Sequence, residues 1–325
     1  MHNKGRFATL DGLRGIAALL VMLYHAGTAS PLAMPGGYLA VDLFFALSGF
    51  VIALAYETRL KAGLSLREFT VNRLVRIYPM FLVGAVIGAL LLPAHLGILV
   101  MLPDFESPRI LFPANPPMWS LLFELLINIA FAVLALRVGP RGLLTILAVS
   151  GAMLCHAAFG SDKALNVGAF WDTAAYGMAR TVFSFTLGIG IYRLRNQLEI
   201  RRRLTWQAWL LFPVLIATLM FAPEDRAWWD LACVFVILPA MLWLGTLWDL
   251  PKGKVAEALG DLSYPLYCIH APLIWAGKKW DMNMGMLCLA MVAAAWALDR
   301  WVDRPVRGKV TAIMKGRRRA VPAAT

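Results

Sequence analysis

The sequence predicts an all-α polytopic membrane protein, a helical bundle of about ten transmembrane helices with both termini in the cytoplasm. Composition is the first reason, because 60% of the 325 residues are hydrophobic and only 15% are charged, against roughly 25% charged in soluble domains. Length is the second reason, because ten spans of about 20 residues use about 200 positions. The remaining loops are too short for a soluble domain of about 50 residues or more.

Ten apolar runs separated by polar breaks support this prediction. They lie near residues 13–31, 38–57, 77–100, 119–138, 142–159, 174–194, 205–222, 229–248, 262–280 and 283–301. A very short link near residues 137–141 joins the fourth run to the fifth, which predicts an antiparallel hairpin. We expect residues 1–310 to form a single integral-membrane domain, and the basic tail at residues 311–325 to be disordered at a membrane surface.

The distribution of positive charge is the third reason. If both termini are inside, 25 of the 31 Lys and Arg residues fall in cytoplasmic segments, which fits the positive-inside rule. The net charge of +12 then reflects topology, and we expect no nucleic-acid binding because apolar runs separate the basic residues. A cleaved signal peptide is the alternative for the first run, but that run contains Asp11, Arg14 and His25.

Ionisable side chains inside the first two runs are the first functional signal, since each costs roughly 2.5–3.5 kcal/mol on membrane insertion. Arg14 and His25 are 11 residues apart, which places them on one helical stripe, about 16 Å apart along the axis. We expect Arg14 at the cytoplasmic rim and His25 deeper, facing the same cavity. A snorkelling arginine and a hydrogen-bonded histidine are the structural alternative. Asp42 could orient the imidazole of His25 or pair with another helix.

Polar residues in and before the third and fourth runs extend the candidate site. Arg73 and Arg76 share a helical face and suit phosphate oxygens, although they could also contact lipid headgroups as topology determinants. Ser120 and Glu124 lie on one polar stripe that should face the bundle interior. Glu124 then needs a partner, either His25 or an arginine, unless it forms a purely structural pair.

The ninth run contains His270, a second membrane-embedded imidazole, which is either part of the site or a packing histidine. The four cysteines lie in apolar runs without a CxxC pair, so we expect neither a disulfide nor a zinc site. The sequence has no HExxH, GxxxxGK[ST] or GxSxG motif. These absences argue against a metal hydrolase, a P-loop ATPase and an α/β-hydrolase.

Six segments occur in order along the chain. They are Leu10-Asp-Gly-Leu-Arg-Gly-Ile-Ala-Ala18 followed by His25, Asp42-Leu-Phe-Phe-Ala-Leu-Ser-Gly-Phe50, Arg73-Leu-Val-Arg-Ile-Tyr-Pro79, Trp119-Ser-Leu-Leu-Phe-Glu124, Ser263-Tyr-Pro-Leu-Tyr267 followed by His270, and Asp303-Arg-Pro305. With them the sequence resembles acyltransferase family 3, the integral membrane family of bacterial sugar O-acetylases, over about residues 7–307.

The resemblance implies ten spans in the bacterial cytoplasmic (inner) membrane, a cytoplasmic acyl-CoA donor and an acceptor hydroxyl at or beyond the membrane. It also implies that His25 is the essential histidine and that Arg14 is its partner. Many relatives carry an added periplasmic esterase-like domain, whereas this sequence stops after the tenth span. A separate periplasmic protein could therefore take part in acyl delivery.

We therefore predict a single acyltransferase domain that moves an acyl group, most often acetyl in the family, from acyl-CoA to a hydroxyl of a carbohydrate or glycolipid. His25 would be the general base or the acyl acceptor, with Asp42 or Glu124 holding its ring. Acyl-CoA is a co-substrate, and neither a bound cofactor nor a metal is expected. The arginines that would hold the acyl-CoA phosphates are Arg73, Arg76 and Arg14. The supporting residues are Ser48, Trp119, Ser120, Tyr264 and His270.

Two other classes of function stay open on the sequence. A helical bundle with buried acids, histidines and arginines is also typical of a proton-coupled transporter or exporter. Transporters often contain internal repeats, and we find none here. The other class is a non-catalytic assembly partner in polysaccharide export. Release of CoA would separate the enzyme from both.

Overall fold

We describe the fold from a computed structural model, which covers residues 6–27, 34–134, 137–160, 164–251 and 253–320. Helices dominate these ranges, and the strands within them are a single parallel pair of two residues each, β1 (Arg203–Leu204) and β2 (Trp248–Asp249). The predicted all-helical class is therefore confirmed.

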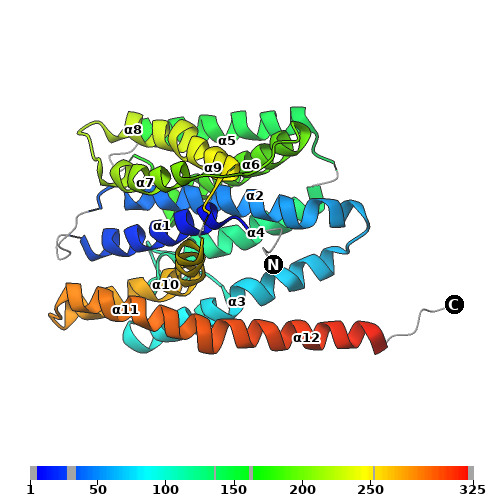
Figure 1. The fold of residues 1–325 in the computed structure, drawn as a ribbon. Helices are drawn as coiled ribbons and strands as arrows, with labels where there is room; N and C mark the ends of the chain where they lie inside the picture. The colour runs from blue at the N-terminus through cyan, green and yellow to red at the C-terminus, as the bar shows by residue number, and fades with distance from the viewer. Residues whose placement is uncertain (1–5, 28–33, 135–136, 161–163, 252, 321–325) are drawn as a thin grey trace.

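Twelve α-helices make up the bundle (Figure 1). They are α1 (Ala8–Ala26), α2 (Ala40–Lys61), α3 (Leu66–Leu91), α4 (Met118–Leu134), α5 (Pro140–Gly160), α6 (Ala174–Gln197), α7 (Leu211–Met220), α8 (Arg226–Ala232), α9 (Leu238–Leu247), α10 (Lys254–Lys279), α11 (Met284–Leu298) and α12 (Arg304–Ala320). The π-helical segments η6 (Cys233–Ile237) and η7 (Asp299–Asp303) join α8 to α9 and α11 to α12 without a break. The described residues thus form ten continuous helical rods.

Five of these rods are long and apolar enough to cross a membrane by length and composition. They are Gly37–Lys61, Leu66–Leu91, Pro140–Gly160, Arg226–Leu247 and Met284–Ile313. Two shorter apolar helices, Met118–Leu134 and Trp206–Met220, accompany them. The other three rods, α1, α6 and α10, carry ionisable side chains within their length. The cytoplasmic placement of both termini stays a prediction.

The C-terminal helix extends into the segment for which we expected disorder. α11 and α12 form one long rod along an edge of the bundle (Figure 1), and α12 continues to Ala320. Apolar residues recur at helical spacing through Val306, Val310 and Ile313, which supports an amphipathic helix despite the basic composition. Residues 321–325 lie outside the described part of the chain.

Local sequence signals account for several helix ends. Ser65 caps α3, where its hydroxyl accepts from the backbone N–H of Glu68 at 3.2 Å, as the Ser-x-x-Glu capping box predicts. Asn283 caps α11 in the same way. Gly27 ends α1 with φ +64°, a conformation that favours glycine. Pro79, which ends the Arg73-Leu-Val-Arg-Ile-Tyr-Pro79 segment, lies within the continuous helix α3.

Helix α1 lies in the middle of the bundle, where it packs against α2, α7 and α10, and α2 packs against α6 (Figure 1). The contact between α2 and α6 depends on Gly49 and Gly188. A Cβ atom at Gly188 would overlap the carbonyl oxygen of Ala46, and one at Gly49 would overlap that of Phe185. The two backbones can approach so closely because each helix offers a glycine to the other.

We expect the substitution Gly188→Ala to destabilise the protein by about 1–3 kcal/mol, because the added methyl group forces α2 and α6 apart. Gly190→Ala is the matched control on the same helix, since a Cβ atom there meets nothing within 4 Å. Thermal unfolding in detergent measures both. Equal unfolding temperatures for the two variants would contradict the close packing at Gly188.

Candidate active site

A cavity of about 170 Å³ lies between α1, α2, α3, α4 and α10. Most of its wall is apolar, which suits an acyl chain or a pantetheine arm. Its polar wall consists of Asp11, Arg14, Ser48, Arg73, Arg76, Ser120, Glu124, Ser263, Tyr264 and Tyr267. Seven of these residues were predicted from the sequence as catalytic, acyl-CoA-binding or supporting residues, and they come from five separate segments of the chain. The fold therefore brings distant motifs to one cavity.

Three predicted arginines converge on this cavity. The side chain of Arg73 is only 12% exposed, and its Nη2 lies 3.4 Å from Glu124 Oε1. Its Nε atom is buried without a hydrogen-bond partner in the described part of the chain. Arg76 lies over the ring of Tyr264, 5.3 Å from its centroid. Because a buried guanidinium N–H without a partner is costly, this end of the cavity suits an anion.

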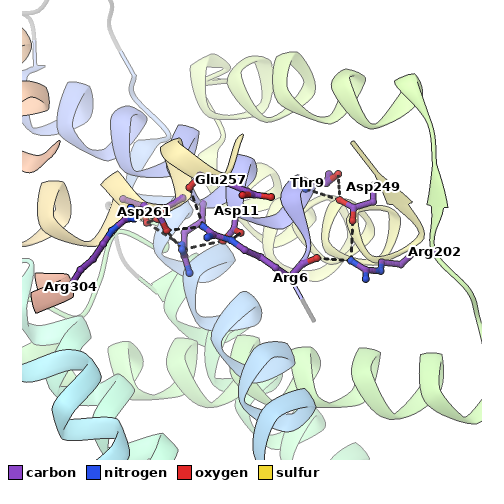
Figure 2. A network of polar contacts seen from close by, with 11 residues as sticks. Arg6, Thr9, Asp11, Arg202, Asp249, Glu257, Asp261 and Arg304 are labelled. Atoms are coloured by element: carbon purple, nitrogen blue, oxygen red, sulfur yellow. Dashed lines mark hydrogen bonds and ion pairs between the residues drawn. The ribbon is translucent and has the colours of Figure 1, made fainter. Parts of the chain in front are cut away.

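Arg14 is fixed at the cavity by α10. Its Nε donates to Ser263 Oγ at 3.0 Å and its Nη2 to the carbonyl of Gly260 at 2.8 Å. A network of ion pairs at the start of α1 reinforces this arrangement (Figure 2). Arg6 bridges Asp11 and Asp261, and Asp11 also accepts from Arg14. The network ties α1 to α10 and holds the Arg14 guanidinium in place.

Glu124 finds its partners across the cavity. The Ser48 hydroxyl donates to Glu124 Oε1 at 2.7 Å, and Arg73 lies on the same oxygen. Of the two partners expected for Glu124, the structure therefore supplies the arginine. The prediction that Glu124 could hold the ring of His25 is not met, because its carboxylate is engaged with α2 and α3.

His25 and His270 lie side by side. His25 is in the last turn of α1, and its Nδ1 lies 2.9 Å from the carbonyl oxygen of Val21. His270 Nε2 lies 3.3 Å from His25 Nδ1, and the two ring centroids are 4.9 Å apart. His270 is only 1% exposed. The second imidazole of the sequence is thus the direct neighbour of the first.

His25 does not line the cavity, which corrects the expectation that it faces the same cavity as Arg14. Tyr267 connects the cavity to the histidine pair, because it lines the cavity and its ring centroid is 5.5 Å from that of His270. The Tyr267 hydroxyl is 2.7 Å from Ser120 Oγ. Helical spacing places Arg14 and His25 on one stripe, but it cannot show which side chain of a neighbouring helix fills the space between them.

Asp42 does not contact His25 either. It forms a buried ion pair with Arg180 of α6, with 2.5 Å between Asp42 Oδ2 and Arg180 Nη2. Arg180 also donates to the carbonyls of Val167 and Tyr38. Trp119, predicted as a supporting residue, lies near this pair, with its ring 6.0 Å from the Arg180 guanidinium carbon. The structural pair with another helix, which we gave as the alternative for Asp42, is what the structure contains.

Two residues of this region, Tyr267 and Arg180, are not among the site residues predicted from the sequence. Tyr267 stands in the Ser263-Tyr-Pro-Leu-Tyr267 segment, but its place in the motif gave no role. Arg180 lies within the apolar run at residues 174–194, and a lone arginine in such a run is a signal for a buried partner. Asp303 of η7 forms an ion pair with Arg76, with 3.5 Å between its Oδ2 and Arg76 Nη1.

The comparison with protein families decides which chemistry this arrangement serves. The acyltransferase domain model of acyltransferase family 3 matches residues 7–298, nearly the whole chain. The chain belongs to acyltransferase family 3. The cavity arginines and both histidines of this acyltransferase lie inside the matched range.

Two relatives show the range of the similarity. Protein 2 in the picA locus of Rhizobium radiobacter is 33% identical over an alignment of 181 residues. The alignment covers 47% of this chain and 95% of that protein. Peptidoglycan O-acetyltransferase OatA of Listeria monocytogenes is 33% identical over 88 residues, which are 26% of this chain and 14% of that protein. No solved structure matches the family 3 acyltransferase described here.

Proposed function

We propose that this acyltransferase moves an acyl group, in the simplest case acetyl, from cytoplasmic acyl-CoA to a hydroxyl of a cell-envelope or exported glycan or glycolipid. The site would lie in the cytoplasmic (inner) membrane of a bacterium. Membership of acyltransferase family 3 supports the reaction class, and the name of the peptidoglycan relative supports a glycan acceptor. Family membership also favours an enzyme over a transporter or an assembly partner.

One observation carries this proposal: three arginines line a largely apolar cavity, and Tyr267 of the same cavity lies with its ring centroid 5.5 Å from that of His270, the neighbour of His25. Arg14, Arg73 and Arg76 line the cavity and can hold the phosphate groups of acyl-CoA through charged hydrogen bonds. The apolar walls would then enclose the acyl end near Tyr267. His25 is partly exposed, so an acceptor could reach it.

His25 supplies the acid–base chemistry in this proposal. As the acceptor oxygen attacks the thioester carbonyl, its proton passes to the imidazole. The new C–O bond forms, the C–S bond breaks, and the leaving thiolate takes the proton from His25 to give CoA. In the second route His25 attacks the thioester carbonyl, the C–S bond breaks and CoA leaves as its thiolate. The acceptor hydroxyl then cleaves the C–N bond of the acyl-imidazole, and its proton goes to the thiolate. Both routes return His25 to its neutral form.

Turnover of acetyl-CoA tests the proposal. The purified protein in detergent or nanodiscs is mixed with acetyl-CoA, with and without candidate glycans, and free thiol is measured. We expect thiol release that rises when an accepted glycan is added. Absence of both release and CoA binding, with acetyl-CoA and with longer acyl-CoA esters, would overturn the proposal and favour the transporter.

The substitution Arg73→Ala should raise the KM for acetyl-CoA by about 10–100-fold, because charged hydrogen bonds contribute about 1.5–3 kcal/mol. The KM of Arg73→Lys should lie between those of the wild type and Arg73→Ala, because lysine keeps the positive charge but lacks the two parallel N–H donors of the guanidinium group. Arg67→Ala is the matched control, since Arg67 is exposed near the start of the same helix. An unchanged KM in Arg73→Ala would remove this side chain from the donor site.

A further inference from the structure

The hydrogen positions on both histidine rings follow from their backbone partners. A carbonyl oxygen can only accept, so an imidazole nitrogen that lies against one must carry the proton. His25 Nδ1 lies 2.9 Å from the carbonyl oxygen of Val21, and His270 Nδ1 lies 2.8 Å from that of Tyr267. Both neutral rings are therefore Nδ1–H tautomers, and each Nε2 carries a lone pair.

This assignment gives the contact between the two rings a direction. His270 Nε2 is an acceptor, and it lies 3.3 Å from His25 Nδ1, which is a donor. The Nδ1–H of His25 is thus shared between the Val21 carbonyl and His270. Among the described residues, no carboxylate is hydrogen-bonded to His25, and Asp42 and Glu124 are engaged elsewhere. An imidazole occupies the place that an acid takes in a catalytic triad.

Helix α10 holds the His270 ring rigidly. The ring is buried, and its Nδ1 lies against the carbonyls of Leu266 and Tyr267. Pro272 lacks an N–H, so the Cys268 carbonyl one turn earlier has no partner within the helix. Asn115 Nδ2 donates to that carbonyl at 2.9 Å and replaces the missing bond. The backbone around His270 therefore stays fixed despite the proline.

We propose that His270 is the positioning residue for His25, because it accepts the Nδ1–H and so keeps the Nε2 lone pair of His25 directed at the reacting groups. The inference rests on the proposed acyl transfer. During transfer by the base route, the proton of the acceptor hydroxyl moves to His25 Nε2 and then to the leaving thiolate, while the Nδ1–H stays in place. The hydrogen bond to His270 becomes charge-assisted while His25 is an imidazolium.

Two substitutions of His270 separate this role from simple packing. His270→Phe keeps a ring of similar size but removes the acceptor, whereas His270→Gln places an amide oxygen at about the position of Nε2. We expect His270→Phe to lower kcat by about 10–100-fold, as the loss of a charged hydrogen bond predicts, with the KM for acetyl-CoA within about twofold. His270→Gln should recover most of kcat. A packing role would instead favour the Phe variant over the Gln variant and would overturn the inference.

Histidine NMR tests the tautomers without any turnover. In wild-type protein labelled with [¹⁵N]histidine, His25 and His270 should both show a protonated Nδ1 and a bare Nε2, with His25→Ala and His270→Phe used to assign the signals. An Nε2–H tautomer of His25 would overturn the inference even in an active enzyme. A wild type that gives the expected tautomers but neither turns over nor binds acyl-CoA would overturn the proposed function, and with it the catalytic role of His270.

Discussion

His25→Ala should abolish acyl transfer, with kcat reduced by about 10²–10⁴-fold or to background, because the substitution removes the imidazole that we propose takes the hydroxyl proton. Thiol release from acetyl-CoA in the presence of an accepted glycan measures the loss. Binding of acetyl-CoA should persist, since the cavity arginines are untouched and His25 does not line the cavity.

His156→Ala is the matched control for this experiment. His156 lies on α5 and pairs through its Nδ1 with the Tyr176 hydroxyl at 2.8 Å, away from the cavity and the histidine pair. The His156→Ala variant should keep wild-type turnover. Both variants are compared for yield, monodispersity in detergent and unfolding temperature. Wild-type turnover by a folded His25→Ala protein would end the role assigned to His25.

Arg180→Ala should destabilise the protein by about 3–5 kcal/mol, because it leaves the carboxylate of Asp42 buried without its counter-ion. Both side chains of this pair are at most 2% exposed. The double variant Asp42→Ala with Arg180→Ala should lose much less than the sum of the single variants, since it leaves neither charge unpaired. Denaturant or thermal unfolding in detergent measures all three.

Lys61→Ala provides the contrast for the buried pair. Lys61 also forms an ion pair, with Glu57, but its side chain is 59% exposed, so its loss should cost no more than about 1 kcal/mol. Additive losses from Asp42→Ala and Arg180→Ala would contradict a coupled pair. A well-folded double variant without acyl transfer would show that this pair serves catalysis as well as stability.

The sequence predicted those residues of the site that carry an ionisable side chain within or beside an apolar run. Arg14, Arg73 and Glu124 stood out because charge within or beside an apolar run needs a partner, and the structure gathers all three at one cavity. Tyr267 carries no such signal, since a tyrosine among apolar residues is ordinary. Its place in the cavity, with its hydroxyl against Ser120 of α4, emerges only when the helices are packed together.

The sequence by itself determined the helical class, the ten apolar runs and the identity of the polar residues within them, because hydropathy, helix caps and charge are properties of short stretches of chain. Only the tertiary structure decided which charges meet. Asp42 pairs with Arg180 on α6, Glu124 with Arg73, and His25 with His270, which is 245 positions away. Such partners are chosen by how the helices pack, since every buried polar group must find the donor or acceptor that packing places within reach.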